Sequence, residues 1–463
     1  MKPFLRSALS FALLFSTPVA GRARAAESGK EKAGQKSTAE EAHDKAFAAA
    51  ETLYATAQYA EAEKAAQALV AARTQALGAE GKETLLARLL LAEALRMQGK
   101  AVESETQLRE LLPVVAKVFG AEDRETLRCQ SALIAAIGSL GRNVEAEEGL
   151  RSLIATATRV LGPEDKVTLL TRRRLAESWY FQGKQAEAET DLRQRLPIYE
   201  RTLGAEDRET LRCQFHLIRV LSAQNKHAEV EALGRSLLPL QTKVLGAEHP
   251  ETLETREQWA FSLLLLDKRA EAEAEFRQML PIYQRKLGAE NQATLYCQNL
   301  LIKALMAQHK DAEVEAQCRS LLPLQNKVHG VASTETLHCQ LQLLEALDAQ
   351  KKNAEAVELC RSLLPLQRAF LKSLSAQDKD AELERLCHSL IMLHTKVLGA
   401  ESTETLECHV FLLLALKAQD KNAELEAECR SLTPIYIKLF GAEGKDTVFC
   451  QALLVEALAA QDK

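Results

Sequence analysis

The sequence contains little of what builds β-sheets and irregular loops. Aromatic residues make up 5% of its 463 positions, and it holds only 20 glycines and 11 prolines. Aromatic and β-branched residues favour strands, whereas the alanine, leucine, glutamate, lysine and arginine that dominate here favour helices. The composition therefore predicts an all-α protein. Its 47% content of hydrophobic residues excludes a chain that is disordered throughout.

The chain also lacks an excess of positive charge and the common catalytic signatures. Its 59 Lys and Arg against 64 Asp and Glu give a net charge of −5, which disfavours a nucleic-acid partner. No nucleotide-binding loop, nucleophile elbow or HExxH sequence occurs, and no cysteine pair has CxxC spacing. We therefore expect a protein that is not an enzyme, with no small-molecule substrate, no cofactor and no metal site.

Long hydrophobic runs are missing as well, apart from one near the N-terminus. Residues 1–25 contain Lys2 and Arg6, an uncharged run over 7–21 and small residues at 23 and 25, a pattern that predicts a signal peptide and export to the cell envelope. The alternative is an uncleaved N-terminal membrane segment that holds the protein at the cytoplasmic face of a membrane. Residues 26–36 are polar and predict a linker.

What the sequence does contain is a repeat. Each unit has two segments with helical apolar periodicity joined by a short polar turn, for example 209–223 and 227–245, so each unit is predicted to be a helical hairpin. A glycine, expected to stop the second helix in a left-handed conformation, marks each connection between units. These glycines recur at one constant interval, at Gly78, Gly120, Gly162, Gly204, Gly246, Gly288 and Gly330.

The repeat is interrupted once. Two full units after Gly330 would end at position 414, whereas the next glycine of this kind is Gly399, so one unit is truncated. We therefore divide the chain into a first array of about eight hairpins over 37–372, a truncated repeat over 373–399, and a terminal repeat with a capping helix over 400–463. Either one longer helix or a turn at 372–375 joins the two sides of the interruption, and we favour the longer helix.

The ten cysteines follow the repeat and predict core packing. Six share one position of the first helix and four share one position of the second helix, where other units carry small or hydrophobic residues. The cluster of Cys387, His388 and His394 lacks the ligand spacing of a zinc site. Paired carboxylates of the second helix, such as Glu229 and Glu231, are interpreted as solvated.

The repeat phrases carry a family resemblance. A 42-residue unit with LGxExxETL, the turn QGK at 98–100 and the phrase AEAE resembles the tetratricopeptide repeats of kinesin light chains. This resemblance implies a right-handed superhelical solenoid with the first helix of each hairpin inside, used for binding protein. Bacterial members that accompany bacterial tubulin imply a tubulin filament as partner and membrane association through the N-terminus. The alternative is an exported envelope scaffold that organises periplasmic or surface proteins.

Two departures from the family narrow this expectation. Residues 26–45 are too short and polar for the coiled coil that binds the motor heavy chain. The family often holds a peptide backbone with an Asn six residues after the Thr of ETL, and no Asn occurs at that position here. A folded partner is therefore favoured over an extended peptide. The residues at that position are Leu90, Ala132, Arg174, His216, Gln258, Leu300, Gln342, Phe411 and Leu453.

The presumed inner face carries basic side chains with aromatic neighbours. We predict that these bind an acidic partner through guanidinium–carboxylate pairs, and that reversing their charge preserves folding because they face away from the core. Glu177, Glu254 and Glu257 dilute the positive charge, so a mixed solvated surface is the alternative. The predicted partner-binding residues are Arg128, Arg173, Arg174, Arg212, Phe215, His216, Arg219 and Lys303.

Overall fold

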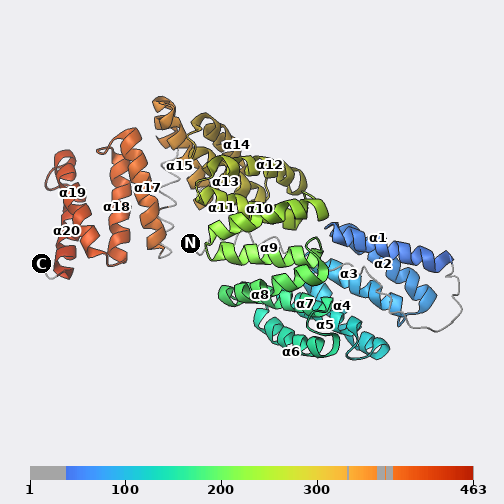
Figure 1. The fold of residues 1–463 in the computed structure, drawn as a ribbon. Helices are drawn as coiled ribbons and strands as arrows, with labels where there is room; N and C mark the ends of the chain where they lie inside the picture. The colour runs from blue at the N-terminus through green and yellow to red at the C-terminus, as the bar shows by residue number, and fades with distance from the viewer. Residues whose placement is uncertain (1–37, 331–332, 362–370, 372–378, 462–463) are drawn as a thin grey trace. The chain divides into compact units, whose positions relative to one another are not determined.

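The computed structural model describes residues 38–330, 333–361, 371 and 379–461. Their secondary structure is helical throughout, which confirms the all-α repeat solenoid (Figure 1). The chain forms two compact units, residues 1–275 and 276–463, and the division falls within α12 (Arg269–Leu287).

The first unit contains the helices that precede α12. They are α1 (Thr38–Ala55), α2 (Tyr59–Leu77), α3 (Lys82–Met97), α4 (Ala101–Phe119), α5 (Arg124–Ser139), α6 (Asn143–Leu161), α7 (Lys166–Phe181), α8 (Gln185–Leu203), α9 (Arg208–Ala223), α10 (His227–Val244) and α11 (Pro250–Leu265).

The second unit contains the helices that follow α12. They are α13 (Gln292–Met306), α14 (Asp311–His329), α15 (Thr334–Ala349), α17 (Asp380–Leu398), α18 (Thr403–Ala418), α19 (Asn422–Phe440) and α20 (Lys445–Ala460). Residues 353–361 are also helical, and the connection predicted at 372–375 lies outside the described residues.

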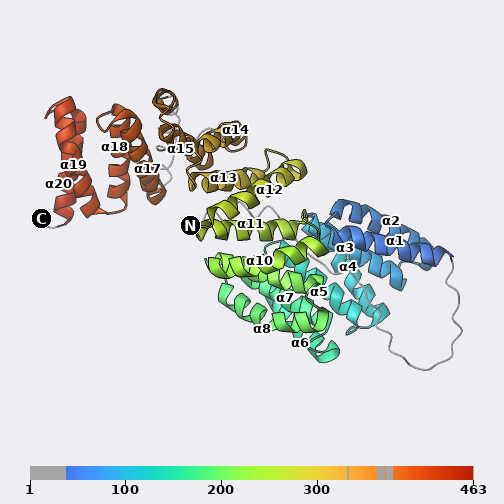
Figure 2. The same ribbon diagram turned by 45° about the horizontal axis from the view of Figure 1, so that its top comes forward.

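Successive helices pack as antiparallel neighbours within each unit (Figures 1 and 2). In the first unit the first helices of the hairpins also contact one another, α3 with α5, α5 with α7, α7 with α9 and α9 with α11. They therefore form one continuous layer, and the side chains that they direct away from the second helices share a common face.

Each connector contains a glycine, and in most units a hydrogen bond from the following threonine closes it. Gly120 has φ 109° and ψ 148°, an extended conformation at positive φ that only glycine adopts readily, so it ends α4 without the left-handed ψ expected from the sequence. The Thr126 hydroxyl donates to the Gly120 carbonyl oxygen at 2.7 Å. Asp123 accepts from the backbone N–H of Glu125, which caps α5. The threonine contact recurs in six units, and the Oγ1 atoms of Thr168, Thr210 and Thr252 have no hydrogen-bond partner among the described residues.

Prolines inside the second helices do not end them, as the sequence predicts. The helix α4 continues beyond Pro113 to Phe119, and α8 continues beyond Pro197 to Leu203. The apolar pattern continues across each proline and secures the helix by packing, although proline removes one backbone donor.

A buried carboxylate joins each hairpin to the next, and we call this contact the glutamate clamp. In the hairpin of α7, Gln182 Nε2 donates to the Glu147 carboxylate at 2.8 Å, and Lys184 Nζ lies 2.7 Å from the same group. Trp179 Nε1 also donates to Glu147, at 2.9 Å. The same Gln and Lys contacts, 35 and 37 residues apart, hold Glu63, Glu189, Glu315 and Glu384.

The clamp corrects our interpretation of the paired carboxylates. The first glutamate of a pair is exposed, as predicted, and Glu187 is an example. The second turns toward the following hairpin: the Glu231 side chain is 14% exposed and lies 2.9 Å from Lys268 Nζ. The sequence signal that could have predicted the clamp is a glutamate followed 35 residues later by a glutamine and 37 residues later by a lysine.

A large core cluster runs through the first unit. It includes Tyr54 of α1, Leu95 of α3, Leu175 of α7 and Phe215 of α9, all of which are buried. Residues from the first and fifth hairpins therefore share one apolar interior. The backbone carbonyl of Ala55 also accepts a hydrogen bond from the Arg208 guanidinium, 153 residues further along the chain. The array thus curves enough within this unit for its first hairpin to reach α9.

No helix among the described residues is both long enough and apolar enough to cross a membrane. The predicted N-terminal signal and linker, residues 1–36, lie outside the described residues.

The clamp predicts how Glu147→Gln behaves. Burial favours the neutral carboxyl, but hydrogen bonds from Lys184, Trp179, Arg151 and Gln182 lower the Glu147 pKa from its ordinary 4.5 to about 2. The carboxylate therefore stabilises the fold fully above about pH 5, and this stabilisation is lost as the pH falls toward 2. We expect the variant to lose about 2 kcal/mol of unfolding free energy at pH 7 and to show a shallower acid dependence.

Urea unfolding followed by tryptophan fluorescence measures this effect, because both tryptophans, Trp179 and Trp259, lie in the first unit. The exposed Glu187 is the matched control, and Glu187→Gln is expected to change stability by less than about 0.5 kcal/mol. Equal losses in the two variants would contradict a special role for Glu147.

Candidate partner-binding surface

Most of the predicted basic strip is buried, which corrects the expectation of an exposed inner face. Arg173 of α7 is 1% exposed, and Arg212 and His216 of α9 are 3% and 2% exposed. Arg174, Phe215 and Arg219 are buried with them. The prediction that these side chains face away from the core, so that reversing their charge preserves folding, is therefore wrong. The curvature of the first unit then places them against helices from other hairpins instead of against solvent.

The buried arginines alternate with buried carboxylates. Arg173 Nε lies 3.0 Å from Glu209 Oε2, and Arg212 NH1 lies 2.9 Å from Glu209 Oε1. Arg212 Nε lies 3.1 Å from Glu251 Oε1, which extends the chain of charges to α11. We call Arg173, Glu209, Arg212 and Glu251 the buried ion network. The guanidinium groups that we predicted to bind a partner therefore pair with carboxylates of the same chain.

The pKa directions follow from this alternation. Burial favours the protonated form of Glu209, but two flanking guanidinium groups hold its pKa at about 2. For Glu251 burial outweighs Arg212, so its pKa is raised. Burial and the charges of Arg173, Arg219 and Arg212 together lower the pKa of His216. His216 is therefore neutral at pH 7, and its Nε2 lies 3.0 Å from Arg173 NH1.

Two further arginines tie distant parts of the unit together. Arg174 NH2 lies 3.4 Å from Glu93 Oε1, a residue of α3 that is 81 positions earlier in the chain. Arg219 Nε lies 3.2 Å from Glu254 Oε1, and its guanidinium lies 4.6 Å from the centroid of the Tyr180 ring. Such a stacked cation gains from both the carboxylate and the ring face.

The remaining two predicted residues lie closer to solvent. Arg128 NH1 lies 2.6 Å from Glu125 Oε2, within its own helix. Lys303 of α13 is half-buried and makes no ion pair among the described residues. Nothing in the structure tests whether these eight residues bind a partner, and that role remains a prediction. Of the eight, within the described part of the chain, only Lys303 has its charge left free for one.

The residues six positions after the Thr of ETL do not form a continuous peptide-binding surface. Leu90, Ala132, Leu300 and Leu453 are buried apolar residues that contribute to the core. Gln342 of α15 is 4% exposed, and its Oε1 has no hydrogen-bond partner among the described residues. An amide that could hold a peptide backbone is therefore present in two units of the array, as Gln258 and Gln342, and not along its length.

The cysteines are core residues, as predicted. All ten are buried free thiols. Burial raises the pKa of Cys129 to about 12 and that of Cys360 to about 11, so neither is a reactive thiolate at neutral pH. The described residues include no group of three or more His, Cys, Asp or Glu side chains arranged to hold a metal ion.

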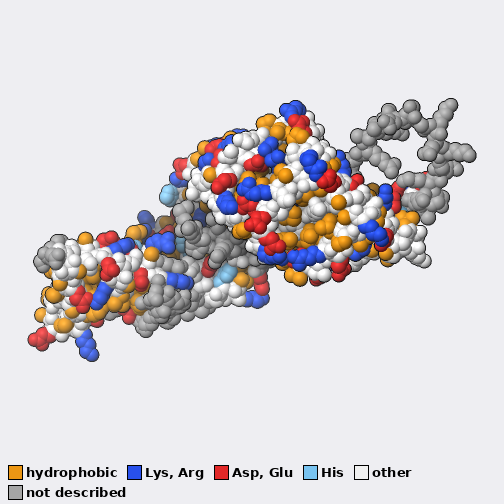
Figure 3. Space-filling model, turned by 90° about the horizontal axis from the view of Figure 1, so that it is seen from below, with side chains coloured by type: hydrophobic (Ala, Val, Ile, Leu, Met, Phe, Trp, Pro, Cys, Tyr) orange, Lys and Arg blue, Asp and Glu red, His pale blue; other side chains and the backbone are white. Residues whose placement is uncertain are grey.

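The outer surface mixes both signs of charge. In the face shown in Figure 3, Lys and Arg side chains lie beside Asp and Glu side chains. Exposed ion pairs between hairpins include Lys117 with Glu80 at 2.8 Å and Lys327 with Glu290 at 2.5 Å. Exposed pairs of this kind contribute little to stability and leave no broad basic field.

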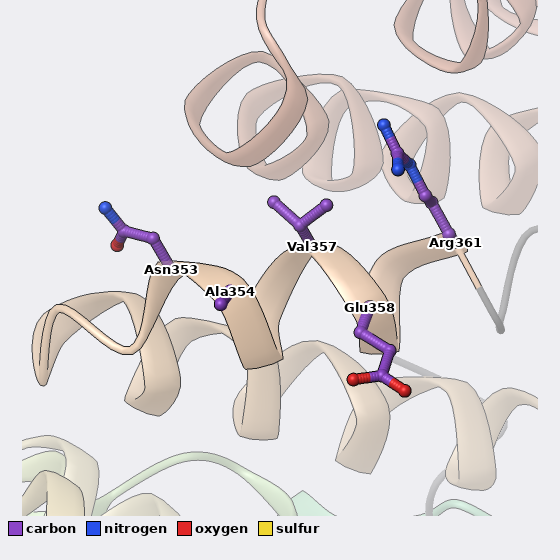
Figure 4. Close-up of a pocket in the computed structure, with 5 residues that line it drawn as sticks. All are labelled: Asn353, Ala354, Val357, Glu358 and Arg361. Carbon is purple, nitrogen blue, oxygen red and sulfur yellow. The ribbon is translucent and has the colours of Figure 1, made fainter.

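One open hollow lies beside the interruption of the repeat. It is lined by Asn353, Ala354, Val357, Glu358 and Arg361, which project from one short helical segment (Figure 4). Val357 stands where the preceding hairpin has the clamp residue Glu315. The helix that loses its regular neighbour has thus lost the carboxylate that would hold that neighbour.

The geometry defines an all-α repeat solenoid of helical hairpins, and one segment of it matches a known repeat family. Residues 168–209 match the tetratricopeptide repeat family. Among curated proteins no match was found.

Solved structures that resemble the chain include a kinesin light chain-like protein. This protein, from Podosopora anserina, has nearly identical TPR-like repeats and is 26% identical over 44% of this chain and 96% of its own, with a TM-score of 0.35. The apo form of RapI is 10% identical over 82% of this chain and 98% of its own, with a TM-score of 0.54, and shares the fold.

The buried ion network predicts the effect of Arg212→Met. Removing this guanidinium leaves Glu251 buried without its main partner and Glu209 with Arg173 alone, so we expect a loss of about 3–5 kcal/mol of unfolding free energy. Urea unfolding of the first unit, followed by tryptophan fluorescence, measures it. The exposed Arg201, which pairs with Glu164, is the control, and Arg201→Met is expected to cost less than about 1 kcal/mol. Full stability of Arg212→Met would refute the network.

Proposed function

We propose that this protein is a non-enzymatic scaffold that binds a folded, acidic protein partner. The repeat architecture carries the proposal, because an array of tetratricopeptide-type hairpins presents side chains from many units along one continuous surface. The match at residues 168–209 and the helical-hairpin fold support it. The glutamate clamps make each unit a rigid support, so side chains that project from the first helices are held in fixed positions.

As the binding surface we propose the second unit, because most of the predicted basic residues of the first unit are buried. In the first unit most of the predicted basic residues form ion pairs with buried or half-buried carboxylates, those of Glu209, Glu251, Glu254 and Glu93. In the described part of the second unit Lys303 lacks such a partner and remains half-buried on α13. Charge complementarity with an acidic protein is therefore supported there by a cation that the fold does not neutralise.

As the particular partner we propose a bacterial tubulin filament, linked to membrane through the N-terminal segment. The kinesin light chain-like repeat phrases support it, and tubulin-like surfaces are acidic. We expect the purified chain to sediment with polymerised bacterial tubulin at low salt and to be released as ionic strength rises to 0.15 M, because screening acts over about 8 Å there. Co-sedimentation measures this, with unpolymerised tubulin as control. Absence of the chain from the filament pellet at low salt would exclude this partner.

The second candidate is an exported scaffold of the cell envelope. The N-terminal pattern, two cations followed by an uncharged run and small residues, favours it. The ten free thiols favour a reducing compartment instead. Export predicts a mature chain that begins after Ala25 and fractionates with the envelope. N-terminal sequencing of the chain from its host, together with fractionation, decides between the two, since an intact N-terminus on cytoplasmic membrane contradicts export.

A further inference from the structure

The second unit carries pairs of cysteines at two positions of the repeat that contact each other. One position lies in the second helix of a hairpin, and the other lies 21 residues later, in the first helix of the next hairpin. Cys318 of α14 is paired in this way with Cys339 of α15, and Cys429 of α19 is paired with Cys450 of α20. The two helices that carry each pair pack directly against each other.

The contact between these positions is a property of the repeat. In the first unit Cys213 Sγ lies 3.9 Å from the carbonyl oxygen of Leu192, which is 21 residues earlier. In the second unit Cys339 Sγ lies 3.9 Å from the carbonyl oxygen of Cys318, and the other pair repeats this contact at 3.5 Å. The cysteine of the first helix therefore reaches the same neighbour each time, and the side chain of that neighbour is what changes.

Within each pair the two thiols also hydrogen-bond to each other. Hydrogen bonding with the Cys318 thiol, together with burial, raises the pKa of Cys339. A hydrogen bond from the Cys429 thiol lowers the pKa of Cys450 to about 7, although burial opposes this effect. Each sulfur thus contacts both the backbone and the thiol of its partner cysteine, and two cysteines must lie this close for a disulfide to form.

A third pair at these positions has a different neighbour. Cys387 of α17 and Cys408 of α18 are also 21 residues apart in the sequence, but Cys408 Sγ lies 3.6 Å from His394 Nδ1. The Cys408 thiol therefore contacts an imidazole, and this pair is not part of the proposal.

We propose that Cys318 with Cys339, and Cys429 with Cys450, form two disulfides when the chain folds in an oxidising compartment. Each disulfide links the second helix of one hairpin to the first helix of the next. These cross-links are independent of the partner proposed above. They bear on the envelope scaffold, because four of the ten thiols then no longer favour a reducing compartment.

The oxidant is a disulfide, for which oxidised glutathione is the probe. The Cys450 thiolate attacks one sulfur of oxidised glutathione, which forms a mixed disulfide and releases one glutathione thiolate. The Cys429 thiolate then attacks the Cys450 sulfur, which forms the bond between the two cysteines and releases the second glutathione. The protons of the two cysteines end on the two glutathiones, so the protein is oxidised by two electrons and glutathione is reduced by two.

Burial fixes when this exchange takes place. All four thiols are buried in the folded chain, where a glutathione molecule does not reach them. The exchange therefore accompanies folding, as the repeat brings the two helices of each pair together.

The test refolds the full chain from urea in a mixture of reduced and oxidised glutathione, followed by alkylation with N-ethylmaleimide and tryptic mapping. Trypsin cleaves between the cysteines of each pair, at Arg319 and at Arg430, so each disulfide joins two separate peptides. We expect both joined products before reduction and their separation after it. Cys213, whose neighbour is Leu192, is the internal control and is expected to be alkylated.

Variants and a stability measurement give further readouts. Cys339→Ser is expected to remove the first joined product, to leave Cys318 alkylated and to keep the second pair joined. Cys213→Ser is the matched control and is expected to change neither product. The oxidised chain is expected to keep its helical circular dichroism signal to a higher urea concentration than the reduced chain, because each cross-link restricts the unfolded state.

Three results would overturn the proposal. They are alkylation of the four paired cysteines to the same extent as Cys213, joined peptides that connect cysteines of different pairs, and a lower urea midpoint after oxidation. None of these results bears on the scaffold function, which filament co-sedimentation of the unaltered, reduced chain tests separately.

Discussion

The glutamate clamp is the contact on which the rest of the structure depends, because it converts a constant repeat length into a constant geometry. Its glutamine and lysine stand at fixed intervals after the carboxylate, so a unit of any other length would separate the three groups. Glu147 and Glu384 are held in the same way, although one lies before the interruption and one after it. The clamp spacing of 35 and 37 residues is therefore the same on both sides of the truncated unit.

Constant geometry has a consequence that single units do not show. A small rotation between neighbours adds up over several hairpins, and in the first unit it brings α1 within hydrogen-bonding distance of α9 through Ala55 and Arg208. The face that a shallower array would leave in solvent becomes an interior there. Charged groups in an interior require partners, because the free-energy cost of removing a lone ion from water exceeds the stabilisation that packing provides. The alternation of Arg173, Glu209, Arg212 and Glu251 meets that requirement.

This distinction between local and accumulated geometry explains what the sequence could predict. Helix positions, the connectors at Gly120 and its equivalents, and the burial of the cysteines depend on contacts within one or two units, and the repeat period displays them directly. Arg174 is buried against Glu93, which lies on a helix two hairpins earlier. The repeat spacing in the sequence does not predict that contact. The acids that appeared to dilute the basic strip, among them Glu254, were the available signal, because they occupy positions facing the arginines.

One pair of positions shows how such an array acquires specificity. Arg219 and Glu254 form an ion pair, and the equivalent positions of α13 and α15 hold Lys303 and His338. Leu414 and Phe449, which occupy these positions in α18 and α20, are both more than one third exposed. The glutamate clamps that hold the hairpins together use other residues, so this change does not affect them. In a repeat protein, the residues at one pair of positions can therefore change from an internal ion pair to side chains available for a partner, and the fold is kept. In the second unit these positions no longer form an ion pair between hairpins.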